Sequence, residues 1–263
     1  MIRLQIKPEF ASLLEAHELG SFAQLMQVST GTVIEEDETR DVRCLDLDGQ
    51  KFYLKRTWSE KLNSALESYA RARLAHSKPF KEMMHYRQLE KVGIEVAQVV
   101  AAGEELRFGI PQRGMILTRE VGGQDLAEFY RTASVSERRR ILQQFGLLMG
   151  RLHHNGFYGS TRLKDIIVSD PQSELPGLTL IDRETRNPYP KPVNAKTVIS
   201  RLLFNIRRQA QQGEIFSEPE WRLFCEAYCR ALPDKLAIDA DTLYTGIIEM
   251  LEQMGKPPSP EEG

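Results

Sequence analysis

The chain has 263 residues, of which 41% are hydrophobic and 27% charged, a composition typical of a soluble globular protein. The net charge of −2 argues against a general nucleic-acid binder, so no nucleic-acid partner is expected. No stretch approaches the ~20 apolar residues that a membrane span needs, and the amino terminus has no apolar run of the secretion type. Three cysteines without a framework spacing indicate a reducing compartment, so we expect a cytoplasmic protein.

The first part of the chain predicts strands and one clear helix. Residues 41–56 alternate apolar and polar side chains around Asp48-Gly49, which is a strong hairpin signal. Lys55 lies at the end of the second strand of this hairpin. A helix is expected over residues 78–92, with Gly93 as its stop. Residues 94–105 predict a strand with a turn at Gly103, and residues 114–120 predict another strand.

After a joint at residues 121–123 the pattern becomes helical. Asp125 precedes a short helix over 126–133, and Ser134 or Ser136 caps a long helix that runs to about His154. Arg138 to Arg140 are expected on its solvated face. Short strands follow over 166–168 and 178–182, then helices over 198–209, 218–232 and 242–254. We therefore expect a sheet-rich lobe over 1–120, a helix-rich lobe over 121–254, and a Pro-rich, disordered tail over 255–263.

Three charged residues occupy notable places in this order of elements. Lys55 ends a strand, Glu82 lies 27 positions later on a helix, and Asp182 ends an apolar strand. Phosphoryl transfer needs a cation on the phosphates, a carboxylate to hold that cation, and a carboxylate on the metal. Each of these residues alone is a weak signal. The interpretation depends on their order along the chain: Lys55 on a strand, Glu82 on a helix, the glycine-containing joint at 121–123, the long helix, the loop, and Asp182 at the end of a strand.

This order resembles the lipopolysaccharide kinase family, which phosphorylates Kdo or heptose sugars of the lipid A–core. The matching stretches, from about Asp41 to Arg186, are DGQKFYLKR, FKEMMHYRQLEKVGIEVAQVVAAGE, MILTREVGGQDL, LLMGRLHHNGF and LTLIDRETR. The resemblance implies an α+β, bilobal protein-kinase-like fold, with a small antiparallel-sheet N-lobe and a mainly helical C-lobe. It also implies that ATP and Mg²⁺ bind.

The resemblance assigns roles to matching residues. Lys55 is similar to the strand lysine that holds nucleotide phosphates, and Glu82 to the helix glutamate that pairs with it. Glu120 and Val121 fall in the hinge that meets adenine through backbone groups, with Thr118 just before them. Asp182 looks like the metal-binding aspartate, although Arg183-Glu184 follows it instead of the usual Phe-Gly.

The loop after the long helix, GFYGSTRLKDIIV, departs from the family pattern because it offers no aspartate at the base position. Alignment without a gap places Thr161 there and Ile166 at the metal-binding Asn. A one-residue deletion instead places Ser160 there and Asp165 at the Asn, and we prefer it because Asp165 precedes the apolar strand. An aspartate binds Mg²⁺ as well as an asparagine does. A hydroxyl is a poor base, but general-base help contributes only about 10²–10⁴-fold.

Two further features bear on the nucleotide hypothesis. His153 and His154 lie upstream of the loop, where we expect one of them to pack in the helical lobe rather than to replace the base. The segment VSTGTVIEEDETRD holds only Gly31 where a glycine-rich phosphate loop is expected. Its acidic run would repel phosphates, so we interpret it as a solvent-facing turn.

We therefore expect an ATP- and Mg²⁺-dependent sugar kinase of lipopolysaccharide core biosynthesis, acting at the cytoplasmic face of the inner membrane. Lys55 and Glu82 would orient phosphates, and Asp182 with Asp165 would hold metal and carry catalysis. The alternative is a pseudokinase that binds nucleotide or a partner and regulates envelope assembly. An aminoglycoside- or choline-type kinase ranks last, since such enzymes normally keep the loop aspartate.

Overall fold

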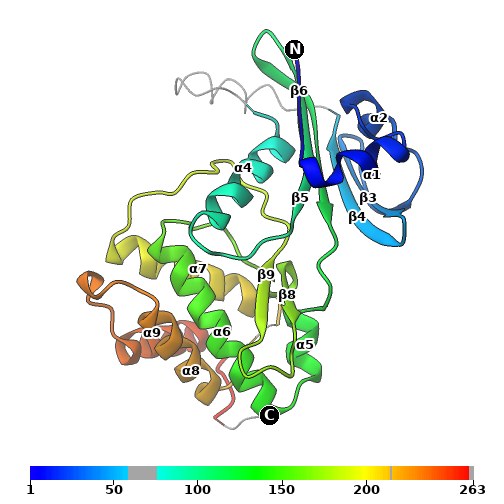
Figure 1. Cartoon of the computed structure of the whole chain (residues 1–263). Coiled ribbons are helices and arrows are strands. Elements are labelled where there is room, and N and C mark those ends of the chain that lie inside the picture. Colours follow the sequence, from blue (N-terminus) through cyan, green and yellow to red (C-terminus); the bar gives the residue numbers. More distant parts are fainter. Residues whose placement is uncertain (59–75, 214, 261–263) are drawn as a thin grey trace. The chain divides into compact units, whose positions relative to one another are not determined.

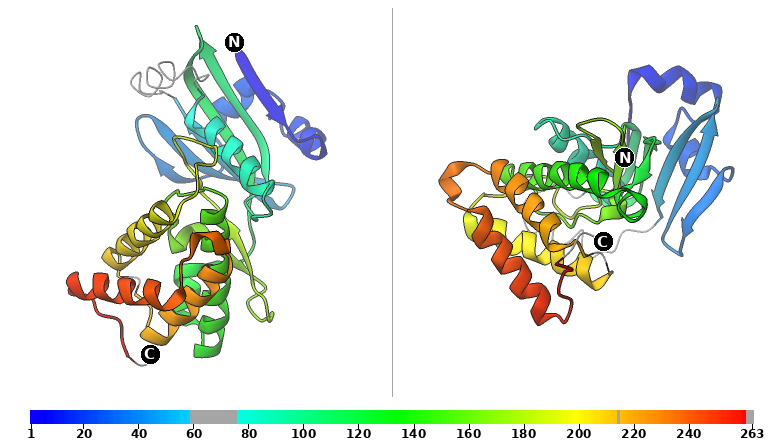
Figure 2. Two further views of the ribbon diagram at one scale, coloured as in Figure 1. Left: turned by 90° about the vertical axis from the view of Figure 1, so that its left-hand side faces the viewer. Right: turned by 90° about the horizontal axis from the view of Figure 1, so that it is seen from below.

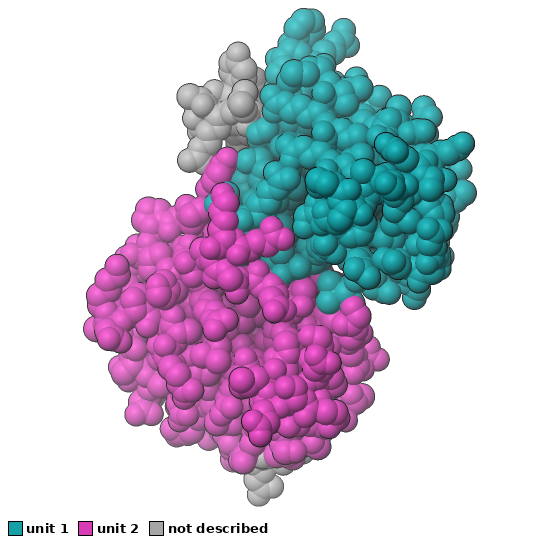
Figure 3. All heavy atoms as spheres, viewed as in Figure 1, with its two compact units in different colours: residues 1–89, 96–121, 182–188 teal, residues 90–95, 122–181, 189–263 magenta. Residues whose placement is uncertain are grey.

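The computed structural model describes residues 1–58, 76–213 and 215–260 (Figure 1). Contacts divide the chain into two compact units, which Figure 3 colours separately. Unit 1 comprises Met1–Leu89, Val96–Val121 and Asp182–Pro188, and unit 2 comprises Glu90–Glu95, Gly122–Ile181 and Tyr189–Gly263. The boundary expected at residue 120 therefore does not hold for two short segments. Residues 90–95 belong to unit 2, and residues 182–188 belong to unit 1.

Unit 1 is built on a six-stranded antiparallel sheet with the strand order β1-β5-β6-β4-β3-β2. Its strands are β1 (Ile2–Ile6), β2 (Thr32–Glu36), β3 (Arg40–Leu47), β4 (Gln50–Thr57), β5 (Val99–Arg107) and β6 (Ile110–Arg119). Strand β4 lies inside the sheet, where Lys55 pairs with Val42 of β3 and Ile116 of β6. The register of two neighbouring strands therefore fixes the backbone that carries Lys55.

The hairpin predicted at Asp48-Gly49 is confirmed. Leu47 pairs with Gln50, so the connection has two residues, and both Asp48 and Gly49 have positive φ, at 54° and 77°. Such left-handed pairs match the twist of the flanking strands, and Asp-Gly is among the commonest sequences that adopt them.

The turn predicted at Gly103 is wrong. Gly103 lies within β5 opposite Leu4 and Met115, and a Cβ built on it would lie 2.8 Å from the Phe22 side chain. The glycine is needed for close packing, not for a turn. The chain turns instead at Phe108-Gly109, where φ is 52° and 77°. Phe-Gly is not a usual turn sequence, which explains why the sequence did not reveal this hairpin.

Helices cover both faces of this sheet (Figures 1 and 2). The short helices η1 (Pro8–Phe10), α1 (Ala11–Ala16) and α2 (Phe22–Gln27) share a core with Phe52 and Leu54 of β4. Alternate residues of a strand point to opposite faces, so Lys55 faces the other side. There it contacts α4 (Lys78–Glu90), the helix predicted over 78–92, and Gly93 follows with a φ of 71°.

Unit 2 is mainly helical. Its helices are α5 (Leu126–Thr132), α6 (Val135–His154), α7 (Ala195–Gln211), α8 (Glu218–Arg230) and α9 (Ala240–Gln253), with the short turns η2 (Leu163–Asp165) and η3 (Asp234–Leu236). A small antiparallel sheet joins β7 (Gln124–Asp125), β8 (Ile166–Ser169) and β9 (Gly177–Leu180) in that order. Asp125 caps α5, and Ser134, not Ser136, caps α6 through a reciprocal pair with Glu137.

The central packing of unit 2 is between α6 and α8. A Cβ on Gly146 would lie 2.6 Å from the Phe224 carbonyl oxygen, and one on Gly150 would lie 2.5 Å from that of Tyr228. These two glycines let the helix backbones approach closely. Arg138 departs from the solvated face expected for it, because it is largely buried and forms an ion pair of 3.1 Å with buried Glu220. A buried carboxylate needs a cation as its partner, and the pattern of apolar and polar residues along the sequence does not reveal which cation that is.

The carboxyl-terminal residues described here, 255–260, contact unit 2. The Ser259 carbonyl oxygen accepts a hydrogen bond from the Glu218 amide at 2.8 Å, and the Lys256 ammonium bonds the Ala210 carbonyl. The remainder of the expected disordered tail, 261–263, lies outside the described residues. Among the helices that the structure describes, none is both long and apolar enough to cross a membrane.

Candidate functional site

Three predicted site residues meet in unit 1. The Lys55 Nζ atom lies 2.9 Å from Glu82 Oε1 and 2.6 Å from Asp182 Oδ1. The Glu82 side chain is 4% exposed, that of Lys55 is 23% exposed and that of Asp182 is 42% exposed. One carboxylate is therefore an internal anchor for the ammonium, whereas the other is partly exposed to solvent.

The two carboxylates stabilise the charge of Lys55. Burial alone would lower the pKa of this ammonium, but the negative charges of Glu82 and Asp182 outweigh burial and raise the pKa above its usual value. Lys55 is thus a permanent cation at neutral pH. Such a cation, half-buried and held at a fixed position, is suited to binding phosphate oxygens.

Helix α4 also holds the backbone next to Asp182. The buried Tyr86 hydroxyl donates to Glu82 Oε1 at 3.1 Å and accepts from the Arg183 amide at 3.4 Å. Burial, and then the Glu82 charge, raise the pKa of Tyr86 well above its usual value, so it stays a hydrogen-bond donor. Asp182 itself has a φ of 51°, a conformation that L-residues rarely adopt without support. Tyr86 supplies part of that support.

The neighbouring histidine contacts the same segment further on. His85 Nδ1 lies 3.2 Å from the Pro188 carbonyl oxygen, and the side chain is buried. Burial, followed by the charge of Arg183, lowers the pKa of His85 to about 4, so the imidazole is neutral at pH 7. Adjacent residues of α4 therefore bond both ends of residues 182–188.

The predicted hinge residues lie at the end of β6 and beyond it. The Glu120 amide donates to the Lys51 carbonyl at 2.9 Å, and its carboxylate accepts from the Tyr53 hydroxyl at 3.3 Å. Thr118 is buried and Val121 is half-buried. An adenine site at Glu120 and Val121 stays a prediction.

Asp165 lies in unit 2, in η2 and just before β8, as the preferred alignment expects. Its carboxylate accepts two hydrogen bonds from Arg162, at 2.6 Å from Nε and 2.8 Å from the terminal nitrogen. Its carbonyl oxygen accepts from the Ile181 amide at 2.8 Å. A metal at Asp165 would therefore compete with a bidentate guanidinium for the same oxygens.

The two hydroxyls that aligned with the missing base differ in surroundings. Thr161 is buried, and its hydroxyl donates to the Gly159 carbonyl at 3.5 Å. Ser160 is exposed, and its Oγ accepts a hydrogen bond of 2.8 Å from Arg208 on α7. Sequence reasoning missed Arg208. The available signal was its helix, which has four basic residues and no acidic one.

The upstream histidines have structural partners. His153 is fully buried, and its Nδ1 lies 2.7 Å from the Tyr228 hydroxyl of α8. His154 Nδ1 lies 3.1 Å from the Ala231 carbonyl oxygen. The expectation that a histidine packs within the helical part, rather than replacing the base, fits these contacts.

The acidic segment is a strand and a turn rather than a turn alone. Glu35 and Glu36 belong to the exposed strand β2, and Asp37 begins the turn into β3. The Asp37 carboxylate accepts from the Thr39 amide and hydroxyl, and these two bonds are the main causes that lower its pKa to about 2. Gly31 has a structural reason, because a Cβ there would lie 2.5 Å from the Cys44 carbonyl oxygen.

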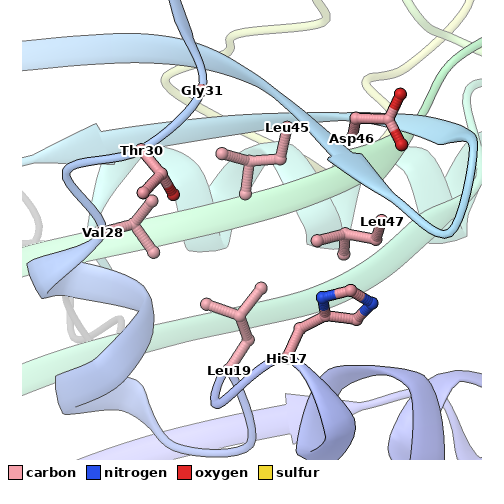
Figure 4. Close-up of a pocket in the computed structure, with 8 residues that line it drawn as sticks. All are labelled: His17, Leu19, Val28, Thr30, Gly31, Leu45, Asp46 and Leu47. Atoms are coloured by element: carbon pink, nitrogen blue, oxygen red, sulfur yellow. The ribbon is translucent and has the colours of Figure 1, made fainter.

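Unit 1 also has a small hollow between the α1–α2 segment and β3 (Figure 4). Its volume is about 280 Å³, and its lining is mostly apolar, including Leu19, Val28 and Leu45. Ligand sites usually enclose about 300–1,000 Å³. None of the predicted site residues lines it, and we assign it no ligand. Among the described residues, no group of three or more His, Cys, Asp or Glu side chains is arranged to hold a metal ion by itself.

Comparisons with known proteins agree with the fold. A solved structure of WaaP in complex with acyl carrier protein is similar, with a TM-score of 0.63 and 16% identity, over 96% of this chain and 99% of that one. This likeness shows an α+β, protein-kinase-like fold, which confirms the predicted fold class. The model of the lipopolysaccharide kinase (Kdo/WaaP) family matches residues 26–228, most of the chain. The chain belongs to the lipopolysaccharide kinase (Kdo/WaaP) family, as its resemblance predicted.

Two other solved structures are more distant. WbdD is 15% identical over 86% of this chain and 46% of its own, with a TM-score of 0.45. The streptomycin–ATP complex of the phosphotransferase APH(2″)-IIa is 13% identical over 53% and 39%, with a TM-score of 0.32. No curated protein matches this chain. Family membership supports a kinase-like role in the lipopolysaccharide core, and a kinase family implies ATP as the phosphoryl donor.

Proposed function

We propose that the chain is an ATP- and Mg²⁺-dependent kinase that phosphorylates a Kdo or heptose sugar of the lipopolysaccharide core. The supporting observation is that Lys55 Nζ lies within 3 Å of both Glu82 and Asp182. An ammonium anchored by one buried carboxylate and adjacent to a partly exposed one supplies the charges that a metal–triphosphate requires. Because the acceptor is attached to a lipid, we place the reaction at the cytoplasmic face of the inner membrane.

The residues fit this donor. Asp182 offers hard carboxylate oxygens of the kind Mg²⁺ prefers, and its side chain is 42% exposed. When bound, Mg²⁺ would neutralise charge on the phosphates. Lys55 would keep its bond to Glu82 and exchange Asp182 for phosphate oxygens. Asp165 is proposed as a second carboxylate for the metal, and Glu120 and Val121 as the adenine contacts.

In the proposed transfer, the acceptor hydroxyl oxygen forms a bond to the terminal phosphorus while the bond to the ADP oxygen breaks. The acceptor proton leaves late, because the transition state is loose, and solvent can take it. The chain then contributes positioning and charge neutralisation rather than a base. This accounts for a working kinase in which Ser160 stands at the aligned base position.

A second candidate is a pseudokinase that binds nucleotide without transferring phosphate. Two contacts favour it: Arg162 pairs with both oxygens of Asp165, and Arg208 bonds Ser160 where a base is expected. Either contact would leave nucleotide binding by Lys55 and Asp182 intact.

The test is transfer from labelled ATP to core oligosaccharide, with Mg²⁺. Wild-type transfer that Lys55→Ala abolishes supports the kinase. A rise in melting temperature with ATP and Mg²⁺, without any transfer, supports the pseudokinase, since a ligand that binds the folded state stabilises it. No thermal shift at millimolar ATP and Mg²⁺ would contradict both.

A further inference from the structure

Helix α7 has an unusual charge distribution. Its sequence, AKTVISRLLFNIRRQAQ, contains Lys196, Arg201, Arg207 and Arg208 but no aspartate or glutamate. The protein as a whole has a net charge of −2, so this helix is a local concentration of positive charge. In contrast, α8 and α9, which also belong to unit 2, both contain acidic residues.

The four cations lie on one side of α7. Exposed positions recur at a spacing of three to four residues, which defines a single helix face. The exposed residues of this face are Lys196, Ser200, Arg201, Phe204, Arg207, Arg208 and Gln211. Positions such as Val198, Leu202 and Ile206 are buried against the rest of unit 2. We call the exposed set the α7 basic face.

These cations are not neutralised within the part of the chain that the structure describes. There, no carboxylate lies within ion-pair distance of any of the four. The arginines elsewhere in unit 2 include clear counterexamples: Arg138 pairs with Glu220, and Arg162 with Asp165. A set of neighbouring cations is repulsive, so its presence on one face favours an anionic ligand.

Arg208 connects this face to the loop. Its terminal nitrogen donates to Ser160 Oγ at 2.8 Å, which fixes the guanidinium beside the residue that aligns with the missing base. The guanidinium also lies 5.9 Å from the centre of the exposed Phe204 ring. One bond to a neutral hydroxyl leaves a full positive charge and further N–H donors for a ligand. An acceptor saccharide has to lie near this loop in a kinase-like fold.

We propose that Arg208, with Arg201 and Arg207, binds an anionic group of the acceptor saccharide, either a carboxylate or a phosphate. The planar fork of a guanidinium matches both groups with two parallel hydrogen bonds. The serine at position 160 serves this role, since a carboxylate there would neutralise Arg208. The inference rests on the proposed function and names the chemical class of its acceptor.

The experiment measures binding of four probes to the full-length protein by titration calorimetry: the sugar acid Kdo, a heptose phosphate, neutral heptose, and ATP with Mg²⁺. Arg208→Gln should weaken binding of Kdo or the heptose phosphate about 10- to 100-fold, and leave ATP affinity unchanged. Arg208→Lys, which keeps the charge but loses the fork, should fall between. Arg230→Gln, an exposed arginine at the end of α8, is the matched control.

Several results would overturn the inference. They are equal binding of the charged sugars by wild type and Arg208→Gln, equal affinity of wild type for neutral and charged sugars, or no binding of either charged sugar. A fourth result concerns lipid binding. If Arg208→Gln weakens co-sedimentation of the protein with phosphatidylglycerol vesicles but leaves sugar binding unchanged, the α7 basic face binds lipid and not the acceptor saccharide. ATP binding by wild type in the same series reports separately on the proposed function.

Discussion

The hydroxyl of Tyr86 donates a 3.1 Å hydrogen bond to Glu82, the buried carboxylate that holds Lys55. The same hydroxyl accepts from the amide of Arg183, directly after Asp182. One phenol thus connects α4 to the backbone of the metal-binding candidate. Because Glu82 and Tyr86 are four residues apart on α4, their side chains lie on the same helix face.

Removal of this hydroxyl tests the connection. Tyr86→Phe keeps the buried ring, removes one hydrogen bond from Glu82, and leaves the Arg183 amide without that acceptor. We expect a loss of about 1–2 kcal/mol in the free energy of unfolding, measured by urea denaturation. We also expect transfer to slow at saturating ATP, since Asp182 is held less firmly. Tyr53→Phe, which removes a more exposed hydroxyl from Glu120, should cost less than about 0.5 kcal/mol.

Variants of the Lys55–Glu82 pair distinguish an effect on the stability of the fold from an effect on ATP binding. Lys55→Met leaves the buried Glu82 carboxylate without its cation, which should cost about 2–3 kcal/mol, reduced from the fully buried case because Lys55 is partly exposed. The double variant Lys55→Met/Glu82→Gln should regain much of that stability, because the buried charge at position 82 is removed and the Asp182 carboxylate is partly exposed to water. Neither variant should show an ATP-dependent rise in melting temperature. A double variant that still responds to ATP would show that Lys55 does not contact the nucleotide.

His85 predicts a dependence of stability on pH. Its pKa is about 4 in the folded protein, against 6.5 for an ordinary histidine. Between these values the unfolded chain binds more protons, so stability present above pH 6.5 is lost as the pH falls towards 4. From about pH 7 to about pH 5 the loss should be roughly 2 kcal/mol.

Denaturation at several pH values checks this expectation. His85→Gln should flatten the dependence in that range, whereas His154→Gln, at an exposed site on the same chain, should keep it. An unchanged slope in the His85 variant would assign the pH dependence to other groups.

The packing of α6 on α8 gives a test confined to unit 2. Gly150→Ala places a methyl group 2.5 Å from the Tyr228 carbonyl oxygen, so the helices must separate, at a cost of about 1–3 kcal/mol. Gly246→Ala is the matched control, because it also lies within a helix and no atom lies within 4 Å of its Cβ position. It should instead stabilise by about 0.5–1 kcal/mol. Thermal and urea unfolding of both variants measure the contrast.

The sequence predicted those features that local patterns encode. Asp48-Gly49 between alternating strands predicted the hairpin, and the order of elements predicted that Lys55, Glu82 and Asp182 would meet. The contacts it missed join residues far apart in sequence: Tyr86 to Arg183, and Arg208 to Ser160. Neither has a periodic signature. The turn at Phe108-Gly109 was missed for a different reason, because a phenylalanine with positive φ is uncommon.

The same distinction applies within the site. The loop could be aligned by its distance from β8, but alignment does not reveal that Arg162 bonds both oxygens of Asp165. An arginine three residues before an aspartate is common on protein surfaces, and only tertiary structure shows this carboxylate to be buried. The side-chain partners of buried charges are therefore set by tertiary structure, which local sequence patterns do not encode.

The proposed function requires that Asp182, held by Lys55, receive the metal of a bound ATP. Titration calorimetry of wild type and Asp182→Asn with ATP, in the presence and absence of Mg²⁺, tests it most directly. We predict that Mg²⁺ strengthens ATP binding by wild type and that the asparagine variant loses this gain, by about tenfold or more, while its Mg²⁺-free affinity is not weakened, because the lost carboxylate only competes with the phosphates for Lys55. Equal Mg²⁺-dependent affinities for the two proteins, or no ATP binding by wild type, would contradict the claim.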